Sequence, residues 1–149
     1  MATIRIEPFS PEHIHQIELR YADWYAFQYM GDWHSEVVTF MATGYSDSLF
    51  VNDTLVMIAN LRMLWNGVGE VWALSSTAAT RYPLAVCKMT RLWLEQHIND
   101  LGLHRVQCKV IAGFKESHAW TKWLKFTPEA YMKKYGPMEE DYVQYARII

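Results

Sequence analysis

Alternating hydrophobic and polar positions mark most of the strands that this sequence predicts. The longest alternating run, residues 54–65, follows the turn pair Asn52-Asp53 and precedes a second turn at Gly67. The strands on either side of these turns are therefore expected to form an antiparallel meander. Strands are expected at residues 3–7, 48–51, 54–65, 70–75, 105–111, 129–135 and 142–148.

Helical periodicity accounts for most other hydrophobic positions. A helix is expected to start after Ser10 and to reach Met30, and Asp32 is placed to cap a second helix. Pro83 suits the first turn of a long helix over residues 83–101, and a short helix is expected over about residues 116–124. The long helix should lie on the sheet, because its polar residues form one narrow stripe of Lys88, Arg91, Glu95 and Asn99.

The order of these elements indicates an α+β fold. The strand at 70–75, the long helix and the strand at 105–111 make a right-handed parallel crossover, whereas the other strands are expected to pair antiparallel. A chain of 149 residues has the length of one typical domain, and no linker or repeat divides it. We therefore expect a single domain over residues 1–149, with a mixed, mostly antiparallel sheet of about seven strands flanked by about four helices.

The segment between the strand at 70–75 and the long helix is the strongest functional clue. Residues 76–82 cannot continue the strand, because Ser, Thr and Ala dominate them. A strand that ends in such a loop and opens into a helix presents backbone N–H groups and the positive end of the helix dipole to an anion. The same pattern also fits an ordinary strand-to-helix connection.

Charge and composition exclude several classes of partner. The net charge of −2 provides no basic field for nucleic acid, and no apolar run approaches the roughly 20 residues of a membrane helix. Without a secretion signal, the chain is expected to be cytoplasmic, with its two cysteines as reduced thiols. No spacing of His, Cys or acidic residues matches a metal site, so no metal is expected.

Aromatic residues make up 15% of the chain, with seven Trp and nine Tyr, which exceeds what a core of this size needs. Some of them are therefore expected to line a pocket or an interface. The first two predicted helices carry an aromatic cluster of Tyr21, Trp24, Tyr25, Phe27, Tyr29 and Trp33.

The order of strands and helices resembles, over essentially the whole chain, the fold of the GCN5-related N-acetyltransferase (GNAT) superfamily. Residues 114–126 are also similar to the family's fourth-helix pattern, with Ser117, Trp120 and Phe126 at its small and aromatic positions. The compact size and the Trp-rich helix further resemble the small GNAT-like proteins of tailed bacteriophages. For a phage protein, the expected location is the host cytoplasm.

The resemblance implies acetyl-CoA as the cofactor and an amine as the acceptor, on a protein Lys, a protein N-terminus or a small molecule. The backbone amide near Leu74 or Ser75 would stabilise the oxyanion, and Glu70 at the head of that strand is the first candidate for the base. Glu36 and His34, on the second predicted helix, are the next candidates.

The cofactor loop departs from the family's Arg/Gln-x-x-Gly-x-Gly/Ala pattern. If Arg81 takes the Arg place, Leu84 and Val86 stand where the family has small residues, and their side chains would crowd a diphosphate. The amides and hydroxyls of the loop, with Arg81 as a phosphate partner, would then hold the cofactor. The expected cofactor-binding residues are Leu74, Ser75, Ser76, Thr80, Arg81 and Ser117.

The fourth-helix pattern also departs at its catalytic position. Thr121 takes the place of the family's frequent general-acid tyrosine, and a threonine hydroxyl is a poor proton donor at neutral pH. Glu70, Ser75 and Thr121 are therefore the catalytic candidates. His118 on the same helix is expected to pack or to cap.

Two functions from different classes remain open. The first is an N-acyltransferase that uses acetyl-CoA to modify an amine. The alternative is a non-catalytic GNAT-fold protein that binds and modulates another protein, such as a host protein, through the aromatic cluster or an edge strand. A virion or self-assembly component is a third hypothesis, and a homodimer stays open for each of them.

Overall fold

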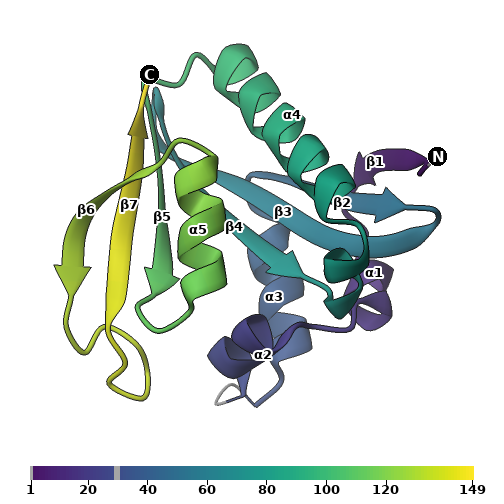
Figure 1. Ribbon diagram of the computed structural model, residues 1–149, viewed down its shortest axis with the longest axis horizontal. Helices are drawn as coiled ribbons and strands as arrows, with labels where there is room; N and C mark the ends of the chain where they lie inside the picture. The colour runs from purple at the N-terminus through teal and green to yellow at the C-terminus, as the bar shows by residue number, and fades with distance from the viewer. Residues whose placement is uncertain (1, 29–30) are drawn as a thin grey trace. The chain divides into compact units, whose positions relative to one another are not determined.

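The computed structural model describes residues 2–28 and 31–149, and Figure 1 shows their arrangement into strands and helices. The strands are β1 (Ile4–Pro8), β2 (Tyr45–Val51), β3 (Thr54–Trp65), β4 (Val68–Ser75), β5 (Arg105–Ile111), β6 (Thr127–Met132) and β7 (Tyr142–Ile148). The helices are α1 (Glu12–Gln16), α2 (Tyr21–Phe27), α3 (Trp33–Met41), α4 (Pro83–Leu101), α5 (Lys115–Trp123) and the 3₁₀ helix η1 (Thr77–Arg81).

The strands form one seven-stranded sheet in the order β1-β2-β3-β4-β5-β7-β6. β4 and β5 pair parallel, whereas β1 with β2, β2 with β3, β5 with β7 and β6 with β7 pair antiparallel. The α+β fold with a mostly antiparallel sheet, predicted from the sequence, is therefore confirmed.

The chain packs into two compact units. The first comprises Met1–Arg62 and Trp72–Gln96, and the second comprises Met63–Val71 and His97–Ile149. A single domain over residues 1–149 stays a prediction.

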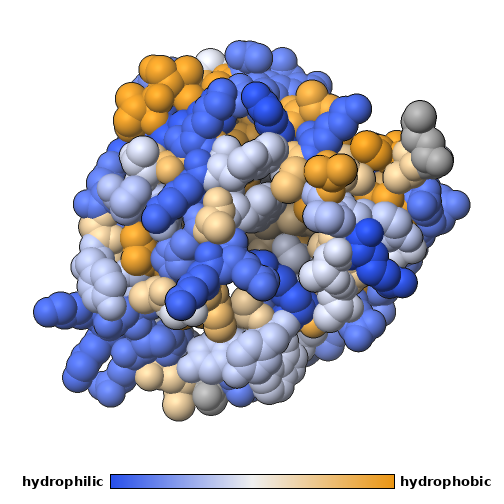
Figure 2. Space-filling model, viewed as in Figure 1, coloured by the Kyte–Doolittle hydropathy of each residue, from blue (hydrophilic) through white to orange (hydrophobic). Residues whose placement is uncertain are grey.

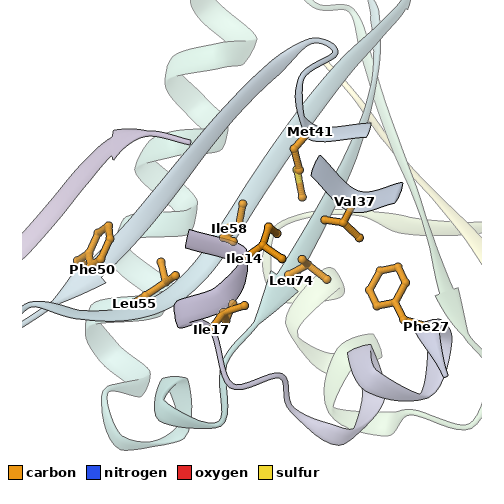
Figure 3. Packing of buried hydrophobic residues seen from close by; sticks show 9 residues of the cluster. All are labelled: Ile14, Ile17, Phe27, Val37, Met41, Phe50, Leu55, Ile58 and Leu74. Atoms are coloured by element: carbon orange, nitrogen blue, oxygen red, sulfur yellow. The ribbon is translucent and has the colours of Figure 1, made fainter. Parts of the chain in front are cut away.

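The core of the first unit lies where α1, α2 and α3 meet the strands β2, β3 and β4 (Figure 3). Ile14, Val37, Ile58 and Leu74 in this cluster are each at most 1% exposed. Burying one such side chain contributes about 1.5–3 kcal/mol, so this cluster is the main source of stability for the helices that surround the end of β4. The cluster comprises Ile14, Ile17, Phe27, Val37, Met41, Phe50, Leu55, Ile58 and Leu74.

The single helix expected from Ser10 to Met30 is wrong, because the chain leaves the helical conformation between α1 and α2. Ile17 and Arg20 have extended backbones, with φ/ψ of −82°/127° and −66°/159°. The segment between them pairs with the chain that follows β4, through a bridge between Leu19 and Ser76. This long-range pairing outweighs the local periodicity. The expected continuation to Tyr29 and Met30 lies outside the described residues.

Two predicted local signals of the first unit, the Asp32 cap and the Asn52-Asp53 turn, are confirmed, whereas α1 has no side-chain cap from Ser10. The Asp32 carboxylate accepts the Ser35 N–H at 3.3 Å and so caps α3. Asn52 and Asp53 adopt positive φ angles of 48° and 63° in the turn between β2 and β3, which pair antiparallel. Gly44, with φ +78°, precedes β2, and a Cβ atom there would lie 2.4 Å from the Leu61 carbonyl oxygen. A residue with a side chain would therefore be strained at this position.

The second unit is built on the antiparallel pair β5–β7, whose register runs from Arg105↔Ile148 to Ile111↔Tyr142. β6 pairs with β7, so the predicted final strand pair is confirmed, although β6 begins earlier than expected, at Thr127. The parallel β4–β5 ladder runs from Val68↔Arg105 to Glu70↔Gln107. The crossover of strand, long helix and strand is therefore present.

Hydrophobic and hydrophilic residues are interspersed over the face shown in Figure 2. Single exposed hydrophobic residues of this kind are normal on protein surfaces. Within residues 2–28 and 31–149, no helix has both the length and the apolar character needed to span a membrane.

Candidate functional site

The backbone at the end of β4 is already hydrogen-bonded within the first unit. The Ser75 N–H donates to Asp23 Oδ2 at 2.9 Å, and the Ser75 carbonyl accepts the Arg20 N–H at 3.0 Å. The Ser76 N–H donates to the Val56 carbonyl of β3 at 3.0 Å. Because N–H groups alternate along a strand, the Leu74 N–H also faces β3. Of the two amides expected to stabilise an oxyanion, the Ser75 N–H is therefore bonded to Asp23, and the Leu74 N–H faces β3.

The expected loop at residues 76–82 is instead the 3₁₀ helix η1. The Ser76 side chain caps its start by accepting the Ala78 N–H at 3.0 Å. The Thr77 N–H donates to the Glu18 carbonyl at 2.9 Å, and the Ala79 N–H donates to the Ser76 carbonyl at 3.0 Å. The expectation that these loop amides form an anion cradle is therefore corrected: intramolecular acceptors occupy them. The Thr80 hydroxyl is also engaged, as it donates to the Thr77 carbonyl at 2.8 Å.

The first turn of α4 does present free N–H groups. The Tyr82 N–H donates to Ala79 and the Val86 N–H donates to Tyr82, but those of Leu84 and Ala85 have no acceptor among the described residues. A helix leaves its first amides unpaired for geometric reasons, and these are available to an anion. The N–H groups that could bind an anion therefore lie at the start of α4, after the loop in which the sequence analysis expected them.

The two side chains beside this helix start are open to solvent. Leu84 stands where the family has a small residue, but its side chain is 86% exposed and so does not pack over the start of the helix. Arg81, the predicted phosphate partner, is also exposed at the end of η1. The crowding expected from Leu84 is absent.

Asp23 is the charged group at the end of β4, and the sequence analysis missed it. Its side chain is only 13% exposed, and its Oδ2 accepts both the Ser75 N–H and the Arg20 Nε–H, the latter at 2.8 Å. Burial raises the pKa of Asp23, although the Arg20 charge and the two hydrogen bonds oppose this. The sequence signal that could have pointed to Asp23 is its place as the one acidic residue in the aromatic segment of residues 21–27.

Glu70, the predicted base, belongs to the second unit and lies in a polar cluster there. Its Oε2 accepts Gln107 Nε2 at 2.9 Å and Lys109 Nζ at 3.0 Å. The side chains of Glu70 and Lys109 are 22% and 23% exposed, so this is a half-buried ion pair. The role of Glu70 as a base stays a prediction.

The hydroxyl of Thr121 is engaged within α5. It donates to the Ser117 carbonyl at 2.7 Å, and both residues are buried. A hydroxyl proton in this bond is held by the helix backbone, which gives no support to a role as general acid. Ser117 likewise lies on a buried face of α5, so its contact with a cofactor stays a prediction.

His118 links α5 to the end of β5 and to β7. Its Nε2 lies 3.0 Å from the Ile111 carbonyl and 3.1 Å from the Ala112 carbonyl, and its Nδ1 lies 2.6 Å from Tyr145 Oη. Carbonyls only accept, so Nε2 carries the hydrogen and Nδ1 accepts the Tyr145 hydroxyl. The packing role expected for His118 agrees with these contacts.

The aromatic cluster divides into a packed part and an exposed part. Phe27 stacks on Trp33 and meets Trp72 edge-on, with centroid distances of 5.5 Å in both pairs. Tyr21 and Trp24 are 65% and 47% exposed on α2, with their rings 6.1 Å apart. Tyr29 lies outside the described residues.

The two next candidates for the base lie on α3. His34 stacks on Trp33 at 3.8 Å and on His15 at 5.3 Å, so its ring is held by packing. Glu36 is exposed on the same helix. Neither contact set points to proton transfer.

The described residues also include possible metal ligands and two cysteines. In the described part of the chain, no group of three or more His, Cys, Asp and Glu residues could hold a metal ion. Cys87 and Cys108 are free cysteines. Burial, with a smaller contribution from Glu70, raises the pKa of Cys108 to about 12, which leaves its thiol protonated and inert at neutral pH.

Comparison with known proteins identifies the fold. No protein-family model matches the sequence, and no curated protein matches it either. Among solved structures, Ard1 from Thermoplasma volcanium aligns with a TM-score of 0.80 and 13% identity, over 98% of this chain and 97% of that one. RimL, a ribosomal L7/L12 alpha-N-protein acetyltransferase, aligns with a TM-score of 0.79 and 15% identity, over 99% and 91%. A GNAT-family acetyltransferase from Bacillus anthracis aligns with a TM-score of 0.74 and 16% identity, over 97% and 94%. The chain therefore has the fold of the GNAT acetyltransferases over nearly its whole length.

Proposed function

We propose that this protein is an N-acyltransferase that transfers an acetyl group from acetyl-CoA to an amine. The observation that carries the proposal is the pair of free amides, Leu84 N–H and Ala85 N–H, at the start of the 19-residue helix α4. The likeness of the fold to acetyltransferases supports it. The α-amino group of a protein is the preferred acceptor class, because RimL, one of the similar structures, is described as an alpha-N-protein acetyltransferase.

The residues present fit a CoA diphosphate at α4 better than at η1. Two helix amides, the positive end of the helix dipole and the exposed guanidinium of Arg81 can together bind a dianion. Leu84, 86% exposed, leaves the approach to these amides open. By contrast, Ser76 and Thr80 serve as capping and turn residues of η1, so we expect them to act indirectly, by holding the helix start in place.

Acetyl-CoA supplies the activated acyl group as a thioester. The chain must then orient the amine, accept its proton and donate a hydrogen bond to the carbonyl oxygen as negative charge develops there. Along β4, the Ala73 N–H faces the same edge as the Ser75 N–H, and the β4–β5 ladder ends at Glu70↔Gln107, before Ala73. We therefore place the oxyanion donor at Ala73 instead of Leu74 or Ser75.

Calorimetry and mass spectrometry test this proposal together. CoA and acetyl-CoA should each bind to the full chain, and acetyl-CoA should acetylate a pool of hexapeptides with varied free N-termini. A matched pool with blocked N-termini and an internal Lys measures side-chain acetylation separately. Absence of binding heat with both ligands at millimolar concentration, together with unmodified peptides in both pools, would refute the transferase.

A specific observation favours a second candidate, a non-catalytic protein that binds another protein, such as a host protein if the gene is of phage origin. Tyr21 and Trp24 are adjacent, exposed aromatic residues on α2, and such pairs are frequent in the centres of interfaces. The double substitution Tyr21→Ala and Trp24→Ala should then abolish capture of a stoichiometric partner. Trp65→Ala is the matched control, because Trp65 is 68% exposed and lies on β3. Equal capture by the double variant and the control would exclude α2 as the binding surface.

A further inference from the structure

Two side-chain hydrogen bonds set the position of Asp23, and a third bond joins the same two segments of chain. Its Oδ2 accepts the Arg20 Nε–H at 2.8 Å and the Ser75 N–H at 2.9 Å, while the Arg20 backbone N–H donates to the Ser75 carbonyl at 3.0 Å. The start of α2 is thus held to the end of β4 through both the N–H and the carbonyl of Ser75. A carboxyl group with two donors on one oxygen has a defined orientation.

The second carboxylate oxygen is available. In the described part of the chain, both hydrogen bonds of Asp23 end on Oδ2, and none involves Oδ1. The side chain retains 13% exposure. Asp23 therefore combines an anchored oxygen with an oxygen that can accept a proton from a molecule at the strand edge.

The strand edge beside Asp23 is the edge to which we assign the oxyanion donor. The Ser76 N–H points to β3, so the Ser75 N–H points to the opposite edge of β4, and the Ala73 N–H shares that edge by alternation. Residues two apart on a strand are separated by about 7 Å. If the acetyl carbonyl oxygen accepts the Ala73 N–H, the amine that attacks the acetyl carbon would lie within reach of Asp23, directly or through one water molecule.

We infer that Asp23 is a catalytic base of the acetyl transfer, and that its Oδ1 accepts the proton that the acceptor amine loses. This inference rests on the proposed transferase function. In the step, the amine nitrogen forms a bond to the acyl carbon, the carbon–sulfur bond breaks, and the sulfur leaves as a thiolate with the bonding electron pair. The proton of the amine passes to Asp23, which releases it to solvent afterwards.

The electrostatic surroundings of Asp23 agree with this role. Burial raises its pKa, which makes the carboxylate a stronger proton acceptor than a solvated aspartate. Arg20, at the start of the same helix, is the charged group that faces it, and the Ser75 side contributes only an uncharged N–H. Glu70 differs, because its Oε2 carries both the Lys109 ammonium and the Gln107 amide.

The isosteric variant Asp23→Asn separates proton transfer from positioning. An Asn oxygen can accept the Ser75 N–H and the Arg20 Nε–H, so the fold and the strand end should persist, but the amide cannot accept a proton. We expect kcat for the free-N-terminus hexapeptide pool to fall by about 10²- to 10⁴-fold, with KM for acetyl-CoA within twofold of wild type. The rise of kcat with pH that wild type owes to Asp23 should disappear in the variant. Asp100→Asn, the same substitution at an exposed acid of α4, is the matched control and should retain kcat within about threefold.

Each outcome decides a different point. An active wild type with an Asp23→Asn variant that keeps both its kcat and its pH profile would overturn the assignment of Asp23 while leaving the transferase intact. A higher KM for acetyl-CoA and a lower melting temperature, with the pH profile of the residual activity unchanged, would show that Asp23 has a structural role only. A wild type that binds no CoA and acetylates neither peptide pool would refute the proposed function itself, and the inference with it.

Discussion

Leu84→Glu is the most direct test of where a CoA diphosphate would bind. Leu84 lies in the first turn of α4 and is 86% exposed, so a glutamate there buries nothing and displaces no neighbour. A carboxylate in the first turn interacts favourably with the helix dipole, which should raise stability by about 0.3–1 kcal/mol. The same carboxylate would repel a diphosphate bound to the Leu84 and Ala85 amides. The substitution should thus stabilise the protein while it weakens the ligand.

The expected weakening follows from Coulomb's law. A charge about 7 Å from two phosphate charges, at an effective dielectric constant of about 40–80, costs roughly 1–2 kcal/mol, or about 5- to 30-fold in Kd. Salt should reduce the effect, since the Debye length is about 10 Å at 0.1 M ionic strength. Leu92→Glu is the control, because Leu92 is 56% exposed on the same helix, about 12 Å further along its axis. That variant should change Kd by less than about twofold.

Titration calorimetry with CoA at about 50 mM and 300 mM salt gives the answer, and thermal melting supplies the stability change. Equal Kd values for Leu84→Glu, Leu92→Glu and wild type at low salt would show that the diphosphate is bound elsewhere. A lower melting temperature for Leu84→Glu would show that Leu84 packs in solution, against the exposure on which the argument depends.

Three further predictions follow from single contacts. Burial raises the folded-state pKa of Asp23, so this residue stabilises the fold most below its unfolded pKa of about 3.9. That contribution falls as the pH rises through the folded-state pKa. Asp23→Asn should therefore raise the melting temperature at pH 7, and the gain should shrink towards pH 3–4. His13→Ala should cost about 3 kcal/mol in denaturant unfolding, since it leaves the buried Ser48 hydroxyl, bonded to Nδ1 at 2.7 Å, and the Ser10 N–H without an acceptor; His13→Asn should cost less, and equal costs would argue against these bonds. Cys108, with its pKa raised to about 12, should resist iodoacetamide at pH 8 until the protein is unfolded, and rapid labelling of the native protein, measured by mass spectrometry, would contradict the raised pKa.

Features that depend on neighbouring residues could be predicted from the sequence. The helix entered at Pro83, the cap at Asp32 and the turn at Asn52-Asp53 are all present. Each depends on the φ preference or hydrogen bonding of residues within one turn of the chain, which act before tertiary contacts form. The order of elements, and with it the fold, follows from these signals and from the hydrophobic periods.

Features that depend on remote partners could not be predicted in this way. Periodicity favoured one helix to Met30, but the segment around Leu19 pairs with Ser76, which is distant in sequence. Remote acceptors also occupy amides that made residues 76–80 look like an anion site: the Glu18 carbonyl, beside Leu19, accepts the Thr77 N–H, and the Val56 carbonyl of β3 accepts the Ser76 N–H. The sequence therefore drew attention to this junction, but it did not show which N–H groups are left unpaired there after folding.

What the sequence determined by itself is the set of strands, the helices α3, α4 and α5, and their order, because side-chain periodicity and backbone preference are local properties. Only the tertiary structure decided which polar groups are left over after folding. Most buried N–H groups find an acceptor in the fold, and for Ser75 at the end of β4 that acceptor is Asp23 of α2. Among the described residues, that remainder includes two unpaired N–H groups at the start of α4 and one oxygen of the Asp23 carboxylate, and these are the groups to which we assign the proposed chemistry.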